Sequence, residues 1–198
     1  MNDPFARLPV VPNFTLTSTD AADGQELPAA QMSAIFGVPG GRDLSPQLSW
    51  SGAPAETRSY TVTMYDPDAP SGSGFWHWVV ADISASVTEL PTGAGDDTGQ
   101  YLPAGAFHLP NDIRATHFLG AAPPPGDSRH RYFIVVQAID VEHVGQLSVQ
   151  GDSTPAFLGF SINAGGHLLA RAVIVPWAEV PATRWPPART PPAAGPAG

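Results

Sequence analysis

The sequence predicts a mainly β protein, an antiparallel β-sandwich with a C-terminal helix and few short helices. Short strand-like runs recur along the chain, 23 prolines and 20 glycines separate them, and only one stretch, late in the chain, has helical signals. Many short strands between Pro/Gly turns are typical of two packed sheets. The length of 198 residues and a hydrophobic content of 42% favour one core. We therefore expect a single domain over residues 1–180 and a disordered Pro/Ala-rich tail over 181–198.

In the first half of the chain, the clearest strand covers residues 60–65, where Tyr60, Val62 and Met64 alternate with more polar neighbours. It ends at Asp66, because the prolines of the DPDAP turn lack backbone donors and fix φ. Residues 14–18 and 31–36 have the composition of further short strands. A Gly-rich loop over 37–45 leads into Leu48-Ser49-Trp50.

In the second half, residues 76–83 are rich in β-formers and predict the strand that follows DPDAP. A long excursion after Ile83 has little periodicity, and we expect one or two short strands in it. Residues 131–141 are apolar nearly throughout, which indicates a central strand buried on both faces. Ser153 or Thr154 can cap a helix that we expect to extend to about Val173, with a break or kink at Gly165-Gly166.

The composition excludes several functions. The formal net charge is −9, and all nine basic residues are arginines. Without lysine the chain cannot form a Schiff base, and its acidity disfavours nucleic acids and anionic membranes as partners. It contains no cysteine for disulfides or thiolate chemistry. We expect no transmembrane segment and no secretory signal, since no run of 18 apolar residues and no basic start are present, and we expect a cytoplasmic protein.

Chemically unusual side chains gather at two proline-stiffened turns. Asp66, Asp68 and His77 surround the first, and His130 and Tyr132 follow the second, GAAPPPG. If the strands that carry them are neighbours, two carboxylates, two imidazoles and a phenol converge on one cleft. Such a set can bind a small anion through donors if each Asp orients a His, raises its pKa and keeps it cationic.

Other interpretations compete with this one. DPDAP can be an ordinary turn, His77 a hydrogen-bonded core histidine, and Arg131 a salt-bridge partner at a strand edge. Two Asp and two His can also hold a metal ion, but no HxxxH or HxH spacing supports this, and we expect neither a metal nor another cofactor. An alternative is a hydrolase that uses the Asp/His cleft on an ester or phosphoester, although no GxSxG elbow is present.

Two long motifs in this order resemble the signature regions of the phosphatidylethanolamine-binding protein (PEBP) family, in its bacterial Raf-kinase-inhibitor-like branch. They are DPDAP at 66–70 with WHW at 76–78, and GAAPPPGDSRHRY at 120–132; SPQLSW at 45–50 and HLLARA at 167–172 also match. The resemblance covers about residues 10–178. It implies a β-sandwich with a small surface pocket for phosphate-like or carboxylate groups and phospholipid head groups.

Carried over position by position, the resemblance implies a ligand-binding pocket of nine residues: Asp66, Asp68, Pro70, His77, Gly120, Ala122, Pro123, His130 and Tyr132. Ala122 departs from the Gly or Cys that is common in relatives, which can change the size of the pocket. The protein is therefore expected to be a binding module more than an enzyme. The family also implies a regulatory role as an inhibitor of kinases or proteases, and a homodimer.

Overall fold

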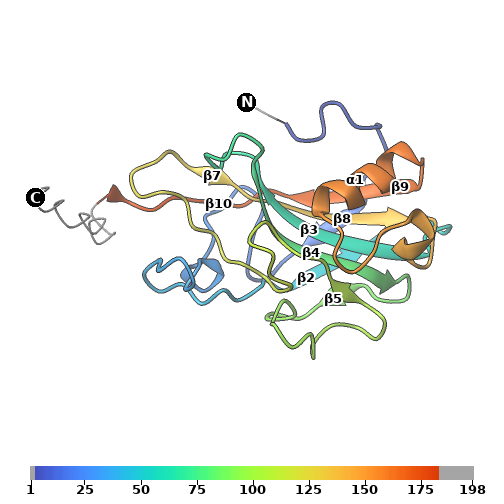
Figure 1. The fold of residues 1–198 in the computed structure, drawn as a ribbon, viewed down its shortest axis with the longest axis horizontal. Coiled ribbons are helices and arrows are strands. Elements are labelled where there is room, and N and C mark those ends of the chain that lie inside the picture. The colour runs from blue at the N-terminus through green and yellow to red at the C-terminus, as the bar shows by residue number, and fades with distance from the viewer. Residues whose placement is uncertain (1–2, 183–198) are drawn as a thin grey trace, which may run out of the picture.

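The computed structural model describes residues 3–182. They form three layers, and a large sheet is the middle layer (Figure 1). This sheet has the strand order β6-β4-β3-β8-β9, and all its neighbouring strands are antiparallel. Its strands in chain order are β3 (Ser59–Asp66), β4 (Phe75–Ser84), β6 (Phe107–His108), β8 (Phe133–Ile139) and β9 (Leu168–Ile174). The predicted β-sandwich with one C-terminal helix is confirmed.

A smaller sheet covers one face of the large one. It consists of β1 (Thr15–Thr17), β2 (Leu48–Ser51) and β5 (Glu89–Leu90), in the order β1-β2-β5. Trp50 of this sheet packs on Tyr60 of β3, with ring centroids 5.4 Å apart. Tyr60, Val62 and Met64 are buried in the core between the two sheets, as their alternation predicts.

The opposite face of the large sheet carries the helix α1 (Pro155–Ala164) and the 3-10 helix η2 (Val144–Leu147). Leu158 and Ile162 of α1 pack there in a second apolar cluster, which includes Val79 of β4 and Ile139 of β8. The large sheet is therefore buried on both faces, and this explains why all seven residues of β8 are buried. β8 is an interior strand, as its apolar composition indicates.

Three short elements complete the fold. The strands β7 (His130–Arg131) and β10 (Trp177–Ala178) pair with each other at one end of the molecule, and η1 (Ala29–Gln31) is a 3-10 turn. The excursion after Ile83 contains β5 and β6, the one or two short strands that we expect there.

Two local predictions are wrong. Residues 31–36 form no strand: Gln31 ends η1, Met32 makes an isolated bridge to Ala121, and residues 34–36 form a turn. The helix ends at Ala164 and does not reach Val173, because Gly166 adopts a left-handed φ of 75° and reverses the chain into β9. The predicted tail, 181–198, lies outside the described residues apart from its first two.

Candidate functional site

The antiparallel ladder brings the two sequence motifs to one end of the large sheet. β3 ends where β4 and β8 begin: Asp66 pairs with Phe75 of β4, and Tyr65 pairs with Phe133 of β8. β7, with His130, lies directly before β8 in the chain. Side chains more than 60 residues apart in sequence therefore meet at this end of the sheet.

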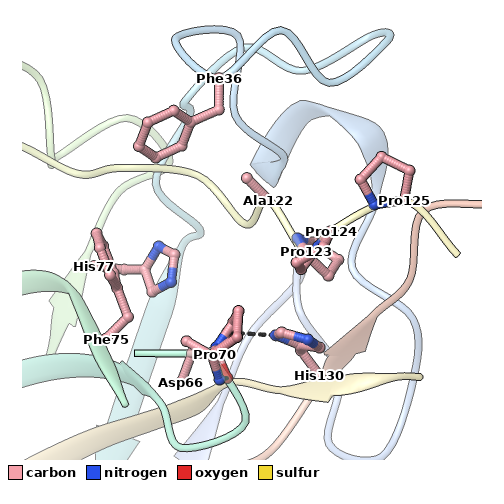
Figure 2. Close-up of a pocket in the computed structure, with 11 residues that line it drawn as sticks. Phe36, Asp66, Pro70, Phe75, His77, Ala122, Pro123, Pro124, Pro125 and His130 are labelled. Atoms are coloured by element: carbon pink, nitrogen blue, oxygen red, sulfur yellow. Dashed lines mark hydrogen bonds and ion pairs between the residues drawn. The ribbon is translucent and has the colours of Figure 1, made fainter. Parts of the chain in front are cut away.

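A cavity of about 340 Å³ opens at this end of the large sheet (Figure 2). Its lining is Phe36, Asp66, Ala69, Pro70, Phe75, His77, Ala122, Pro123, Pro124, Pro125 and His130. Six of the nine residues predicted for the site are among them: Asp66, Pro70, His77, Ala122, Pro123 and His130. Asp68, Gly120 and Tyr132 do not line it. The role of all nine in binding remains a prediction.

The polar centre of the cavity is the buried pair of Asp66 and His130. His130 Nδ1 lies 2.8 Å from Asp66 Oδ2, and the two side chains are 2% and 4% exposed. The other carboxylate oxygen, Oδ1, accepts the backbone N–H groups of Asp68 and Ala69 at 2.8 and 3.0 Å. Asp66 thus closes the DPDAP turn and orients His130 with the same carboxylate.

The second ring nitrogen of His130 faces a surface carboxylate. Nε2 lies 3.4 Å from Oδ2 of Asp127, whose side chain is 43% exposed. This distance is long for a hydrogen bond, and the Asp127 side chain can move into solvent. His130 Nε2 is therefore the polar atom in the cavity whose partner is most easily exchanged.

His77 does not have the predicted Asp partner. Its Nδ1 lies 3.0 Å from the backbone carbonyl of Leu119, and since a carbonyl only accepts, this nitrogen carries the proton. Burial lowers the pKa of His77 and outweighs the Asp66 carboxylate and the backbone groups of Leu119 and Gly120, which raise it, so the neutral ring is favoured. The expectation of a cationic His77 is wrong: in its neutral form Nε2 is an acceptor.

Asp68 pairs with Arg131 and not with a histidine. The Arg131 Nε and backbone N–H donate to Asp68 Oδ2 at 2.8 and 3.0 Å, and Nη2 donates to Oδ1 at 2.7 Å. This fork lowers the pKa of the Asp68 carboxyl. Arg131 is a salt-bridge partner, as its alternative interpretation states, and the pair ties the DPDAP turn to β7 and β8.

The two other predicted residues outside the cavity support its walls. The buried Tyr132 ring packs edge-on against His77 with centroids 5.3 Å apart, and burial together with the Asp66 carboxylate raises the pKa of its phenol. Gly120 lies against backbone, since a Cβ there would stand 2.4 Å from the carbonyl carbon of Met32. Only glycine fits at this position.

The sequence patterns did not reveal how the loop before β2 contributes. Phe36, half-exposed, closes the cavity on the side of Ala122 (Figure 2). Asp43 holds this loop: one carboxylate oxygen accepts the backbone N–H groups of Ala34 and Ile35, and the other accepts that of Gly120. The predicted site also lacks four further lining residues, although the first three lie inside the two motifs and the last directly precedes WHW: Ala69, Pro124, Pro125 and Phe75.

Within residues 3–182, no group of three or more His, Cys, Asp or Glu side chains could hold a metal ion. Over the same residues, no helix has the length and apolar character needed to cross a membrane.

Comparisons with known proteins agree with the geometry. The family model for phosphatidylethanolamine-binding protein matches residues 17–176. The UPF0098 protein YbcL of Escherichia coli (strain K12) is 42% identical over 84% of this chain and 88% of its own length. UPF0098 protein YbhB of the same organism is 40% identical over 80% and 96%.

A solved structure is also similar. The crystal structure of E. coli YbcL, described as a new member of the mammalian PEBP family, matches with a TM-score of 0.78 at 40% identity. It covers 85% of this chain and 99% of the YbcL chain. Fold, cavity and sequence together define a bacterial-type ligand-binding β-sandwich. The chain belongs to the phosphatidylethanolamine-binding protein family, and the resemblance noted from its motifs is confirmed.

Proposed function

We propose that the cavity binds a small phosphorylated head group, and that a zwitterion such as phosphorylethanolamine fits it better than inorganic phosphate does. The observation that carries this proposal is the buried Asp66–His130 pair beside a neutral His77 in an otherwise apolar cavity. The sequence predicts a binding module for phosphate-like anions and phospholipid head groups. Within this class, the proposal favours ligands that carry both an acceptor and a donor.

The phosphate group would bind at His130. Its oxygen would replace the exposed Asp127 carboxylate as the partner of Nε2, while Asp66 keeps Nδ1 and the ring in place. Exchange of one anionic partner for another leaves the local charge similar, which lowers the cost of bringing an anion beside Asp66.

The amino group, or a protonated phosphate oxygen, would bind at His77. A neutral ring with its proton on Nδ1 offers a lone pair at Nε2, and a ligand without a donor would leave it unpaired. Inorganic phosphate near pH 7 also keeps a P–OH donor, so its weaker binding is expected because it has neither a cationic amino group nor carbon atoms that the apolar lining can cover. The Pro70, Pro123 and Pro124 rings and the Phe36 side chain would cover the carbon atoms of the ligand.

Isothermal titration with phosphorylethanolamine and with inorganic phosphate tests the proposal. We expect saturable binding of one phosphorylethanolamine per chain and weaker binding of phosphate. His77→Ala and Ala122→Leu, which removes space from the cavity, should each weaken binding. His143→Ala is the control, since His143 is exposed and remote from the cavity. No heat change with the wild type, or equal affinity in the cavity variants, would reject the proposal.

Hydrolysis of an ester or phosphoester is a weaker proposal. No serine, threonine or other hydroxyl side chain is among the described residues that line the cavity, so the nucleophile would have to be water, a carboxylate or an imidazole. Inhibition of a kinase or protease, a homodimer and a cytoplasmic location stay predictions from the family resemblance and the composition. Pull-down, light scattering and cell fractionation respectively check them.

A further inference from the structure

A second and larger cavity lies on the helix-covered face of the large sheet. It measures about 880 Å³, within the range of roughly 300–1,000 Å³ that is common for ligand sites. The N-terminal segment 3–9, strands β3, β4 and β8, and helix α1 enclose it, and this segment and α1 lie on the same side of the sheet (Figure 1). We call it the helix-side groove.

Aromatic and aliphatic side chains form much of the groove. Tyr65 and Trp76 pack with ring centroids 4.4 Å apart, and Phe5 meets Phe133 edge-on at 5.8 Å. Phe160 of α1, which also lines the groove, is 66% exposed. A hydrocarbon chain would find extensive apolar contact here.

An arginine without a carboxylate within ion-pair distance among residues 3–182 lies directly behind the lining at one end of the groove. Arg171 of β9 pairs directly with Gln137 of β8, so the two side chains share the face of the sheet that Gln137 contributes to the groove. The Arg171 guanidinium lies 4.4 Å from the ring centroid of Phe5, and Nη2 lies 3.5 Å from Asn163 Oδ1. Phe5, Gln137 and Asn163 all line the groove.

Arg171 is only 7% exposed, and its buried Nε has no hydrogen-bond partner among residues 3–182. In the same part of the chain no carboxylate lies within ion-pair distance of it. Burial lowers the pKa of Arg171, and the negative charge of Asp3, in the segment that covers the groove, raises it. The Phe5 ring and the Asn163 oxygen contact the guanidinium, but neither is an anion, and burial of a charge without a paired counter-ion is unfavourable.

We propose that the helix-side groove binds an amphiphilic carboxylate, such as a medium-chain fatty acid, with its carboxylate on Arg171 and its hydrocarbon chain along the aromatic lining. The carboxylate supplies the counter-ion that the guanidinium lacks, and a planar guanidinium can bind it through two parallel N–H groups. Charge complementarity selects an anion over an uncharged amphiphile, although Asp3 on the lining opposes it and Arg7 on the lining favours it.

The groove does not depend on the cavity around Asp66, His77 and His130, which we call the head-group cavity. The groove lies on the face of the large sheet that α1 and segment 3–9 cover. The two cavities have no lining residue in common. Failure of the proposal for one site therefore leaves the other intact.

Isothermal titration of the full chain with decanoate, below its critical micelle concentration, is the test. We expect one decanoate per chain, with decan-1-ol binding more weakly. Arg171→Met should weaken decanoate binding roughly ten- to hundredfold, the effect of losing a hydrogen bond to a charged group, and should reduce the preference over decan-1-ol. Arg171→Lys should retain part of the affinity. Because Met fills the space without charge, the melting temperature should not fall.

A second variant blocks the groove from the helix. A Cβ on Gly159 would meet no atom within 4 Å, and Gly159 lines the groove, so Gly159→Phe should fill it and abolish decanoate binding. Gly145→Phe is the matched control, since Gly145 also has open space and lies outside the groove. Ala122→Leu in the head-group cavity should leave decanoate binding unchanged.

Three binding results and one change of oligomeric state would overturn the proposal. The binding results are no binding of decanoate by the wild type, wild-type affinity in both Arg171→Met and Gly159→Phe, and loss of binding in Ala122→Leu alone. A wild-type dimer that Gly159→Phe converts to a monomer would also overturn it, because a second chain would then occupy the groove. Light scattering measures this mass.

Discussion

At the scale of single residues, one carboxylate does two jobs in the head-group cavity. Asp66 accepts two backbone N–H groups of its own turn through Oδ1 and orients His130 through Oδ2. Removal of this carboxylate would free the turn and the ring together. Asp66 is therefore a poor position for isolating the binding step, and its neighbours make cleaner tests.

Asp127 is one such neighbour. We predict that Asp127→Asn raises the affinity for phosphorylethanolamine up to about fivefold, because it removes an exposed carboxylate that competes with the ligand for His130 Nε2. Titration calorimetry measures the change, with Asp152→Asn as a remote control. Weaker binding in Asp127→Asn would mean that this carboxylate assists the ligand and does not compete with it.

Asp68 tests the structural half of the motif. We predict that Asp68→Asn lowers the free energy of unfolding by about 1–2 kcal/mol at pH 7, since it breaks a partly buried fork with Arg131. The folded protein holds the pKa of Asp68 below the ordinary value of 3.8, so this stabilisation is present above that pH and is lost as the pH falls through the lowered pKa.

Urea denaturation of wild type and Asp68→Asn at pH 7 and at pH 3 checks this. The difference between the two proteins should shrink at pH 3. A difference that is the same at both pH values would show that the carboxylate charge is not what stabilises the turn.

At the scale of elements, the proline-rich turns allowed the site to be predicted from the sequence. DPDAP follows β3, and GAAPPPG lies shortly before β7 and β8. Antiparallel pairing then brings Asp66, His77 and His130 to one end of the sheet. The Phe36 loop could not be predicted in the same way. Its position depends on Asp43 accepting the backbone N–H of Gly120, 77 residues further along the chain, and no local pattern encodes such a contact.

The helix shows how a sequence signal can be misjudged. The sequence predicts a break or kink at Gly165-Gly166 within a helix that extends to about Val173, and only the continuation beyond the break is wrong. Gly166 is instead the stop, and Leu168–Ile174 pairs along β8 as an edge strand of the large sheet. Tertiary pairing outweighs helix propensity here. Arg171 lies in this strand, so the error also hid the buried charge next to the helix-side groove.

The start of the helix was predicted correctly and gives a quantitative test. Thr154 Oγ1 accepts the Phe157 backbone N–H at 3.2 Å, and Pro155 is the first helical residue. We predict that Thr154→Ala lowers the free energy of unfolding by about 1 kcal/mol, whereas Thr154→Ser retains most of it. Guanidinium denaturation measures both. Equal losses in the two variants would argue against a capping role for the hydroxyl.

At the scale of the whole molecule, the three-layer arrangement separates two kinds of cavity. The head-group cavity opens where strand ends meet, and the helix-side groove runs under α1 and segment 3–9. The large sheet between them is buried on both faces and can hold the two sets of side chains rigidly. We expect ligands at the two sites to bind independently.

The acid stability of the molecule should depend on histidines that are buried in neutral form. Burial lowers the pKa of His108 to about 4, against 6.5 for a free histidine. As the pH falls, the unfolded chain therefore binds a proton at His108 before the folded chain does. This residue lowers the free energy of unfolding by at most about 3 kcal/mol between pH 6.5 and pH 4. Burial of His77 acts in the same direction.

We predict that His108→Gln makes the free energy of unfolding less dependent on pH over this interval. Denaturation curves at pH 7, 5.5 and 4.5 measure the slope, and His143→Gln, at an exposed position, is the control. An unchanged slope in His108→Gln would assign the acid sensitivity to other groups.

The most direct test of the central claim is a crystal structure of the protein saturated with phosphorylethanolamine. We predict the phosphate at His130 Nε2, with Asp127 turned away, and the amino group within hydrogen-bonding distance of His77 or Asp66. A ligand bound elsewhere, or an empty cavity beside an unchanged His130–Asp127 contact, would contradict the account.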